Sequence, residues 1–198
     1  MLEEHITQLI LDLHPQDYRG HERLIDNLGV YADSAVPVFV KLLKEDSEGR
    51  VQSIVRALGK VGPLAIPALM PLLDDPIQSI SSRALIALTY IGEPAIPALA
   101  EALHHPNVDH VAMSAAAMLG SMGEIALPTL IANIDDENVK VREAVALGLS
   151  GLGDLAIDVL RQMLDDSSHD VRRHAIETLR RIGTPDALRV LREIRNHP

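Results

Sequence analysis

The sequence contains no cysteine and no tryptophan, and aromatic residues make up only 2% of its 198 residues. The absence of cysteine excludes disulfides, a thiol nucleophile and thiolate metal ligands on this chain. No stretch approaches the roughly 20 uninterrupted apolar residues of a membrane span. The start of the chain, Met1 to Glu4, lacks the basic segment that opens a secretory signal. We therefore expect a cytoplasmic protein with no membrane insertion.

Positive charge is scarce along most of the chain. There are 18 Lys and Arg against 28 Asp and Glu, which makes the formal net charge −10. An acidic body repels phosphate backbones, so nucleic acid is a disfavoured partner. Residues 160–198, with eight arginines against six acidic residues, are the only basic region.

Apolar residues are plentiful by contrast, at 47%, and one leucine among them recurs every 30 or 31 residues. Apolar positions around it are spaced three and four apart, which is the spacing of one face of a helix. A period in this range is typical of a solenoid, in which each unit buries its apolar face against its neighbours. The repeat leucines are Leu28, Leu58, Leu88, Leu119, Leu149 and Leu179.

Each repeat is predicted to form two helices, A and then B, separated by turn residues. Prolines 37, 67, 97 and 128 lie near the start of helix A, which either begins just before the proline or bends there. Glycines 62, 92, 123, 153 and 183 end the B helices, where a left-handed residue is expected. Aspartate pairs at 74–75, 135–136 and 165–166 are expected to end helix A and cap helix B.

The pattern Val-Arg-x-x-Ala-x-x-x-Leu-x-x-x-Gly, followed by Ala-Ile-Pro-Ala-Leu and an Asp pair, resembles the HEAT-like repeat of the phycobilisome-lyase type. The best copies lie at 141–153 and 171–183, whereas the repeats that start at Leu28, Leu58 and Leu88 lack the Val-Arg pair. Members of this class include scaffold proteins and bilin lyase subunits, which attach or remove tetrapyrroles on phycobiliproteins. The resemblance supplies no catalytic residues.

We predict an all-α fold, a right-handed α-solenoid of HEAT-like helical repeats with about six helix pairs and a C-terminal capping helix. A single domain would span residues 1–198. The predicted boundaries are a degenerate N-terminal cap at 1–27, repeats at 28–57, 58–87, 88–118, 119–148 and 149–178, and a C-terminal cap at 179–198.

The resemblance implies that the B helices line the concave side of the solenoid. Positions on the side of each B helix opposite its buried stripe are small or apolar in the middle repeats and charged at the ends. An apolar centre with a polar rim is how protein-binding surfaces are commonly built. The alternative is that the helical phase is off by one and these side chains belong to the core. We name the predicted partner-binding residues the B-helix row: Ser82, Ile86, Tyr90, Met113, Ala117, Leu147, Arg56, Arg173, Glu177 and Arg181.

Two further clusters contain groups that bind ions. His104, His105, Asp109 and His110 have side chains that suit zinc or iron, although an exposed loop with substituted capping residues is the preferred interpretation. The second cluster suits a carboxylate or phosphate, with a solvated helix face carrying i,i+4 ion pairs as the preferred alternative. Its members are His169, Arg172, Arg173, His174 and Glu177.

A HEAT-repeat family of di-iron hydroxylases uses repeated His-Glu pairs. This sequence has one such pair, His21-Glu22, so that interpretation fails on the count. We predict no catalytic residue, no metal site and no cofactor.

The leading hypothesis is a non-enzymatic protein-binding scaffold or adaptor that uses the concave surface, with another protein as its partner. The alternative, implied by the resemblance alone, is a subunit of a bilin lyase or isomerase. Its partner would then be a phycobiliprotein with its bilin. Enzyme activity is left open, with the non-enzymatic reading preferred.

Overall fold

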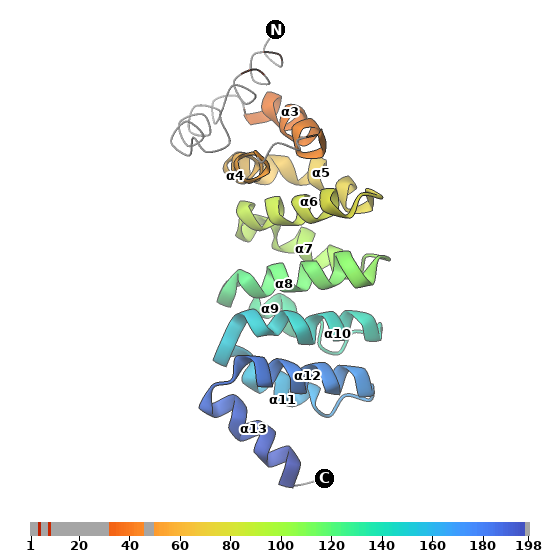
Figure 1. Ribbon diagram of the computed structural model, residues 1–198, viewed down its shortest axis with the longest axis vertical. Coiled ribbons are helices and arrows are strands. Elements are labelled where there is room, and N and C mark those ends of the chain that lie inside the picture. Colours follow the sequence, from red (N-terminus) through yellow and green to blue (C-terminus); the bar gives the residue numbers. More distant parts are fainter. Residues whose placement is uncertain (1–3, 5–7, 9–31, 46–49, 197–198) are drawn as a thin grey trace. The chain divides into compact units, whose positions relative to one another are not determined.

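The computed structural model describes residues 4, 8, 32–45 and 50–196, and all regular elements among them are helices (Figure 1). This confirms the predicted all-α class. The chain divides into two compact units, residues 1–98 and 99–198. Of the predicted N-terminal cap at 1–27, only Glu4 and Gln8 are described. The first repeat leucine, Leu28, also lies outside the described residues.

In the N-terminal unit, the B helices α4 and α6 pack against each other, and a chain of short helical segments connects them. α3 packs against α4, and η3 packs against α6. The elements of this unit are α3 (Ala32–Glu45), α4 (Val51–Val61), η2 (Gly62–Ala65), α5 (Ile66–Leu69), η3 (Met70–Asp74), α6 (Gln78–Ile91), η4 (Glu93–Ala95) and the start of α7 (Ile96–Ala102).

In the C-terminal unit, the B helices α8, α10 and α12 lie side by side, each in contact with the next (Figure 1). α13 packs against α12 and α11. Besides the end of α7, the elements are η5 (Val108–Ala112), α8 (Met113–Ser121), η6 (Gly123–Ala126), α9 (Leu127–Ile131), α10 (Val139–Gly148), η7 (Leu149–Ala156), α11 (Ile157–Met163), α12 (His169–Ile182) and α13 (Pro185–Asn196).

The buried stripe predicted for the B helices is confirmed in both units, because each of its members is less than 5% exposed. The repeat leucines Leu58, Leu88, Leu119, Leu149 and Leu179 are completely buried. The other members are Ala57, Ala84, Leu85, Ala115, Ala116, Val145 and Ala146. The side of each B helix that was predicted to be buried is therefore the buried side.

Most of the repeat prolines lie at helix starts, and the repeat glycines follow the B helices, as predicted. Pro67, Pro97 and Pro128 are the second residues of α5, α7 and α9, where a proline costs no hydrogen bond. Pro37, by contrast, lies inside α3. The five glycines that follow the B helices all have positive φ. Gly183, with φ 67° and ψ 6°, is left-handed helical as expected, whereas Gly62, with φ 76° and ψ −145°, lies in a positive-φ region that residues other than glycine rarely adopt.

One stretch of the described residues, Val51–Asp74, is long and apolar enough by composition to cross a membrane. Gly62 interrupts it, because its backbone angles cannot continue a helix, and α4 ends there. The two halves are the B helix of one repeat and the A segment of the next. α4 and η2 contact each other across this boundary.

The B helices of the C-terminal unit approach one another through residues with little or no side chain. A Cβ atom on Gly120 of α8 would lie 2.0 Å from the carbonyl oxygen of Gly148 of α10. A Cβ atom on Gly148 would lie 2.5 Å from the carbonyl oxygen of Ala116. Backbone therefore packs directly on backbone at this crossing, and no larger side chain fits without separating the helices.

The second aspartate of each Asp pair holds the turn before a B helix. Its carboxylate accepts a hydrogen bond from the backbone N–H two residues later, which corrects the prediction that the pair caps the helix. In α10 the cap is Asn138, whose Oδ1 accepts from the Lys140 N–H at 3.0 Å. The turn contacts are Asp75 with Ile77 at 3.1 Å, Asp136 with Asn138 at 2.7 Å and Asp166 with Ser168 at 2.7 Å.

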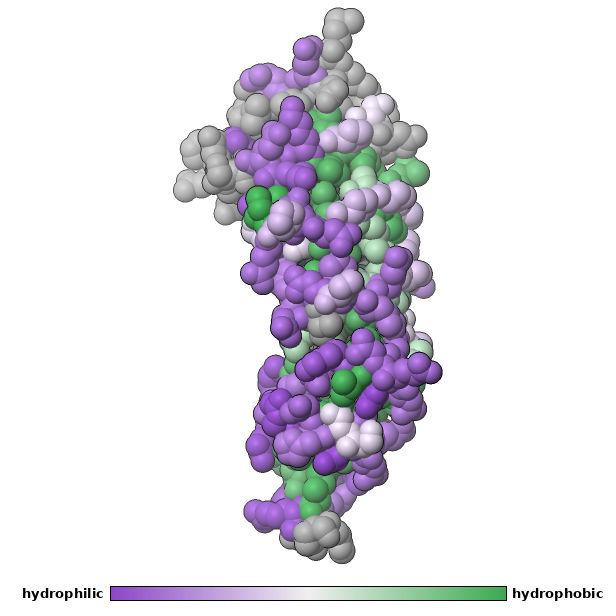
Figure 2. All heavy atoms as spheres, turned by 90° about the vertical axis from the view of Figure 1, so that its right-hand side faces the viewer, coloured by the Kyte–Doolittle hydropathy of each residue, from purple (hydrophilic) through white to green (hydrophobic). Residues whose placement is uncertain are grey.

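The same three carboxylates each bind a basic side chain from the preceding repeat. These pairs are Lys44–Asp75 at 2.9 Å, His104–Asp136 at 2.9 Å and Arg142–Asp166 at 2.7 Å. Hydrogen bonding to Arg142 holds the pKa of Asp166 below its usual value. In the C-terminal unit, the edge that carries these turns faces the viewer in Figure 2 and is largely hydrophilic.

Candidate functional site

The part of the B-helix row in the N-terminal unit comprises Arg56 on α4 and Ser82, Ile86 and Tyr90 on α6. The three α6 residues are spaced four apart and so share one side of that helix. Ile86 is 37% exposed and Tyr90 is 45% exposed, and Arg56 is also exposed. Ser82 is half-buried, and its hydroxyl donates to the carbonyl of Gln78 at 3.0 Å. The exposed side chains of this row are therefore surface groups and not core.

Tyr90 is held in place by α4. The amide of Gln52 donates to the Tyr90 hydroxyl at 2.6 Å. Gly59 lies so close that a Cβ atom on it would be 2.7 Å from the Cβ of Tyr90. The base of Tyr90 thus packs on α4 while its ring remains partly exposed. A fixed ring of this kind offers contact area with little conformational freedom left to lose.

In the C-terminal unit, only one of the three apolar side chains of the row is exposed. Ala117 of α8 is exposed, but Met113 of α8 and Leu147 of α10 are both half-buried. Met113 and Leu147 thus contribute to the packing of the unit as well as to its surface. A charge placed at Ala117 therefore alters this surface with less damage to the packing of the unit than a charge at Met113 or Leu147.

The charged end of the row lies on α12, where Arg173, Glu177 and Arg181 are exposed. Nη1 of Arg173 lies 3.1 Å from Oε1 of Glu177, and the same guanidinium also contacts Asp170 at 3.3 Å. Hydrogen bonding to Glu177 raises the pKa of Arg173. Arg181 donates to the carbonyl of Leu147 at 3.0 Å. Arg173 and Glu177 thus neutralise each other, and Arg181 is held by a backbone carbonyl.

The anion cluster considered on α12 does not form. Nη1 of Arg172 donates to the backbone carbonyls of Asp166 at 2.6 Å and Ser167 at 3.0 Å. His174 is buried, and Arg173 belongs to the ion pairs just described. The preferred alternative, a helix face with an i,i+4 ion pair, is what the structure has.

The histidines after α7 take part in the turn network. No group of three or more His, Asp or Glu residues in the described part of the chain is arranged to hold a metal ion. Nε2 of His104 lies 2.9 Å from the Asp136 carboxylate, and Nδ1 of His105 accepts from the Asn107 N–H at 3.1 Å. His21-Glu22 lies outside the described residues.

The contribution of His104 to stability is expected to fade as the pH rises. Hydrogen bonding to Asp136 raises the pKa of His104 above its usual 6.5. A raised pKa in the folded state means that the stabilisation is complete below pH 6.5 and is lost as the pH rises through the raised value. An NMR titration of the His104 ring should therefore give a higher pKa in the wild type than in Asp136→Asn. Equal values in the two proteins would show that the pair does not form in solution.

The sequence shows that the C-terminal region is basic but does not reveal a cavity of about 600 Å³ between α12 and α13. A sequence signal for it exists: apolar residues and arginines recur three and four apart on α13, which places them on one side of that helix. The cavity is lined by Ile176, Arg180, Leu188, Leu191, Arg192, Ile194 and Arg195.

Comparison with known sequences gives one family and one curated relative. A family model described as HEAT repeats matches residues 66–150 and 127–198. Phycocyanobilin lyase subunit beta of Thermosynechococcus vestitus is 38% identical over 66 residues, which are 33% of this chain and 31% of that protein. The matched segment thus spans about a third of the curated relative.

Solved structures of similar chains include two of low sequence identity. The CpcE–CpcF complex of phycocyanin lyase from Nostoc sp. PCC7120 has a TM-score of 0.46 at 22% identity, over 73% of this chain and 98% of that one. Human deoxyhypusine hydroxylase has a TM-score of 0.41 at 21% identity, over 99% of this chain and 78% of that one. Because the HEAT-repeat model matches more than half of the chain, as the repeat pattern predicted, the chain belongs to the HEAT-repeat family.

Proposed function

We propose that this chain is a subunit of a bilin lyase or isomerase that acts on a phycobiliprotein in the cytoplasm. The observation that carries the proposal is the 38% identity to phycocyanobilin lyase subunit beta. That match supports the bilin-lyase alternative more than a scaffold without enzymatic activity. The relative is described as a subunit, so a second protein is expected in the assembly.

The exposed side chains of the B-helix row support a role in holding the phycobiliprotein. Ile86 and Tyr90 offer an apolar surface on α6, and Ala117 offers a small exposed one on α8. Apolar and aromatic side chains of this kind form the centres of protein interfaces. Because the chain has no cysteine, it cannot carry a bilin through a thioether of its own, so the acceptor thiol must belong to the partner.

The test is co-expression of the chain with phycobiliprotein α and β subunits, a second lyase subunit and a bilin source. We expect a complex that co-purifies and phycobiliprotein that carries or loses bilin only when this chain is present. Absorbance of the denatured phycobiliprotein measures covalent bilin. Co-purification without any change in bilin content would favour the scaffold, and no co-purification at all would reject the lyase reading.

The B-helix row is tested with the variant Ile86→Glu/Ala117→Glu, which adds a charge to each unit. We expect co-purification of the phycobiliprotein to fall more than about tenfold, since a buried unpaired carboxylate costs several kcal/mol at an interface. The matched control is Leu64→Glu/Ile131→Glu, which alters side chains that are 58% and 42% exposed outside the row. Equal capture by the two folded variants would show that the row is not the binding surface.

A further inference from the structure

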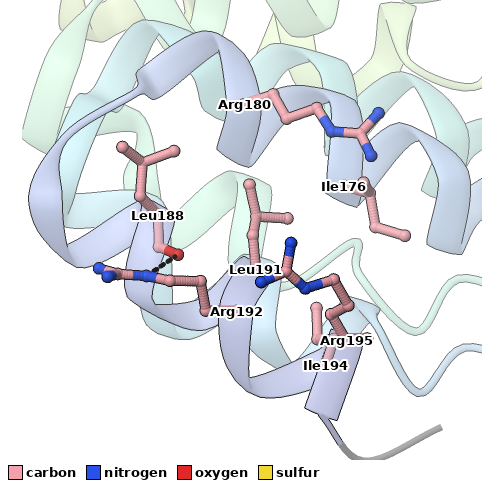
Figure 3. Close-up of a pocket in the computed structure, with 7 residues that line it drawn as sticks. All are labelled: Ile176, Arg180, Leu188, Leu191, Arg192, Ile194 and Arg195. Carbon is pink, nitrogen blue, oxygen red and sulfur yellow. Dashed lines mark hydrogen bonds between the residues drawn. The ribbon is translucent and has the colours of Figure 1, made fainter.

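The groove between α12 (His169–Ile182) and α13 (Pro185–Asn196) combines an apolar floor with three guanidinium groups (Figure 3). Leu188 is 45% exposed, and Leu191 and Ile194 are half-buried. Figure 3 shows Leu188 and Leu191 pointing from α13 toward α12, with Arg180 reaching from α12. The groove lies entirely within the C-terminal unit.

The arginines of the groove have no carboxylate partner among the described residues. Arg180, Arg192 and Arg195 make no ion pair with any described residue; the only bond of this group is from Nε of Arg192 to the carbonyl of Leu188, at 3.2 Å. Of the remaining arginines of this region, three form ion pairs and two, like Arg192, bind backbone carbonyls. Arg161 pairs with Glu193, Arg173 with Asp170 and Glu177, and Arg189 with Asp186, while Arg172 and Arg181 bind backbone carbonyls.

The repeat register explains why the groove is open. Arg180 follows its repeat leucine directly, as Gly120 does in α8. Gly120 is the residue on which the next B helix packs backbone to backbone. A helix packed in the same way on α12 would collide with the long side chain of Arg180. Ile176 likewise occupies the register position of Ala116, so the outer side of α12 carries bulk and charge where α8 carries neither.

From this geometry we propose that the α12–α13 groove binds an amphipathic small molecule with an apolar body and at least two carboxylates. Arginine forms forked hydrogen bonds with carboxylates, and such bonds are stronger beside an apolar floor than in open water. A cavity of about 600 Å³ has the size of small-molecule sites in general. A linear tetrapyrrole with two propionates and a long aliphatic diacid both have this chemistry. The ligand class follows from the groove and does not depend on lyase activity.

The test titrates the full chain with three probes: biliverdin, biliverdin dimethyl ester and hexadecanedioate. Induced circular dichroism and calorimetry report binding. We expect biliverdin or hexadecanedioate to bind, and the neutral dimethyl ester to bind at least about tenfold more weakly than biliverdin, because it cannot form charge-assisted hydrogen bonds with the arginines. Binding of only one diacid identifies the source of the carboxylates, tetrapyrrole or aliphatic.

Variants locate the site. Arg180→Gln/Arg192→Gln/Arg195→Gln should weaken the bound diacid at least about tenfold. The matched control, Arg161→Gln/Arg189→Gln, removes charged side chains that are already paired and should leave the affinity unchanged. Leu188→Asp, at an exposed position, should also weaken binding because it places a like charge on the floor.

Three results would overturn the proposal: no binding of either diacid, measurable binding of biliverdin with equal affinity for its dimethyl ester, or unchanged affinity for the bound diacid in the triple arginine variant. The groove proposal and the proposed lyase function can fail independently of each other. A chain that binds a diacid in this groove but neither retains a phycobiliprotein nor changes its bilin content would reject the lyase reading and keep the groove.

Discussion

Gly120→Val is expected to destabilise the C-terminal unit by about 3–5 kcal/mol, a large part of the stability of a typical domain. Glycine inside a helix ordinarily costs about 1 kcal/mol relative to alanine, so a larger residue would normally stabilise α8. The sign reverses here because a Cβ atom at this position would lie 2.0 Å from the Gly148 carbonyl oxygen. The neighbouring helix is backbone at this point and cannot give way as a flexible side chain would. Urea unfolding followed by circular dichroism measures the change.

The control for this prediction is Gly123→Ala in the same unit. Gly123 has a positive φ of 74° but nothing within 4 Å of an added Cβ atom. Its substitution should therefore cost only the backbone strain, about 1–2 kcal/mol. If Gly120→Val were no more destabilising than Gly123→Ala, the close backbone contact between α8 and α10 would be wrong.

Asp166→Ala is expected to lower the free energy of unfolding by about 2–4 kcal/mol at neutral pH. Asp166 accepts hydrogen bonds from Nε and Nη2 of Arg142 at 2.7 and 3.0 Å, and the two side chains are only 9% and 13% exposed. Removing the carboxylate leaves a guanidinium that is largely shielded from water without its partner. It also removes the acceptor for the Ser168 N–H.

The pH dependence of this effect follows from the lowered pKa of Asp166. A carboxyl group with a lowered pKa in the folded state stabilises the protein above its unfolded pKa, near 3.8, and loses that contribution as the pH falls through the lowered value. The difference in unfolding free energy between wild type and Asp166→Ala should therefore shrink in acid. A difference that is constant from neutral pH to acid would mean that the ion pair contributes nothing.

Two further variants test whether the cost of Asp166→Ala comes from the unpaired charge of Arg142. Arg142→Met/Asp166→Leu should be less destabilised than Asp166→Ala alone, because no charge is left without a partner. Glu193→Ala breaks the exposed pair with Arg161, whose side chains are 49% and 46% exposed, and should cost less than about 1 kcal/mol. Equal costs for Asp166→Ala and Glu193→Ala would contradict the role assigned to Arg142.

The structure also shows how the Val-Arg and Asp-Asp signatures work together. Arg142 belongs to one repeat and Asp166 to the next, and Nη1 of Arg142 also donates to the Asp136 carbonyl at 2.7 Å. The arginine thus joins two successive turns. In the repeat that has His104-His105 in place of an Asp pair, His104 makes the link to Asp136 instead. This repeat has Ala112 where the motif has its arginine, and His104 binds the second aspartate of the next repeat in its place.

The sequence by itself determined the helical class, the repeat length, the buried side of each B helix and the glycines that end those helices. These features depend on spacing within about one helical turn, or on the conformational demands of a single residue, and both are visible in a linear pattern. Tyr90 and Ala117 could be placed on the exposed side of their helices for the same reason.

Only the tertiary structure decided how far the half-buried Met113 and Leu147 protrude, which arginines find carboxylates, and where a groove remains open. Each of these depends on contacts between residues about one repeat apart, such as Gly120 with Gly148 or Arg142 with Asp166. The distance of closest approach between two helices is set by side-chain packing on both of them at once. No spacing along one helix contains that information, which is why Arg180 could be recognised as basic but not as the wall of a groove.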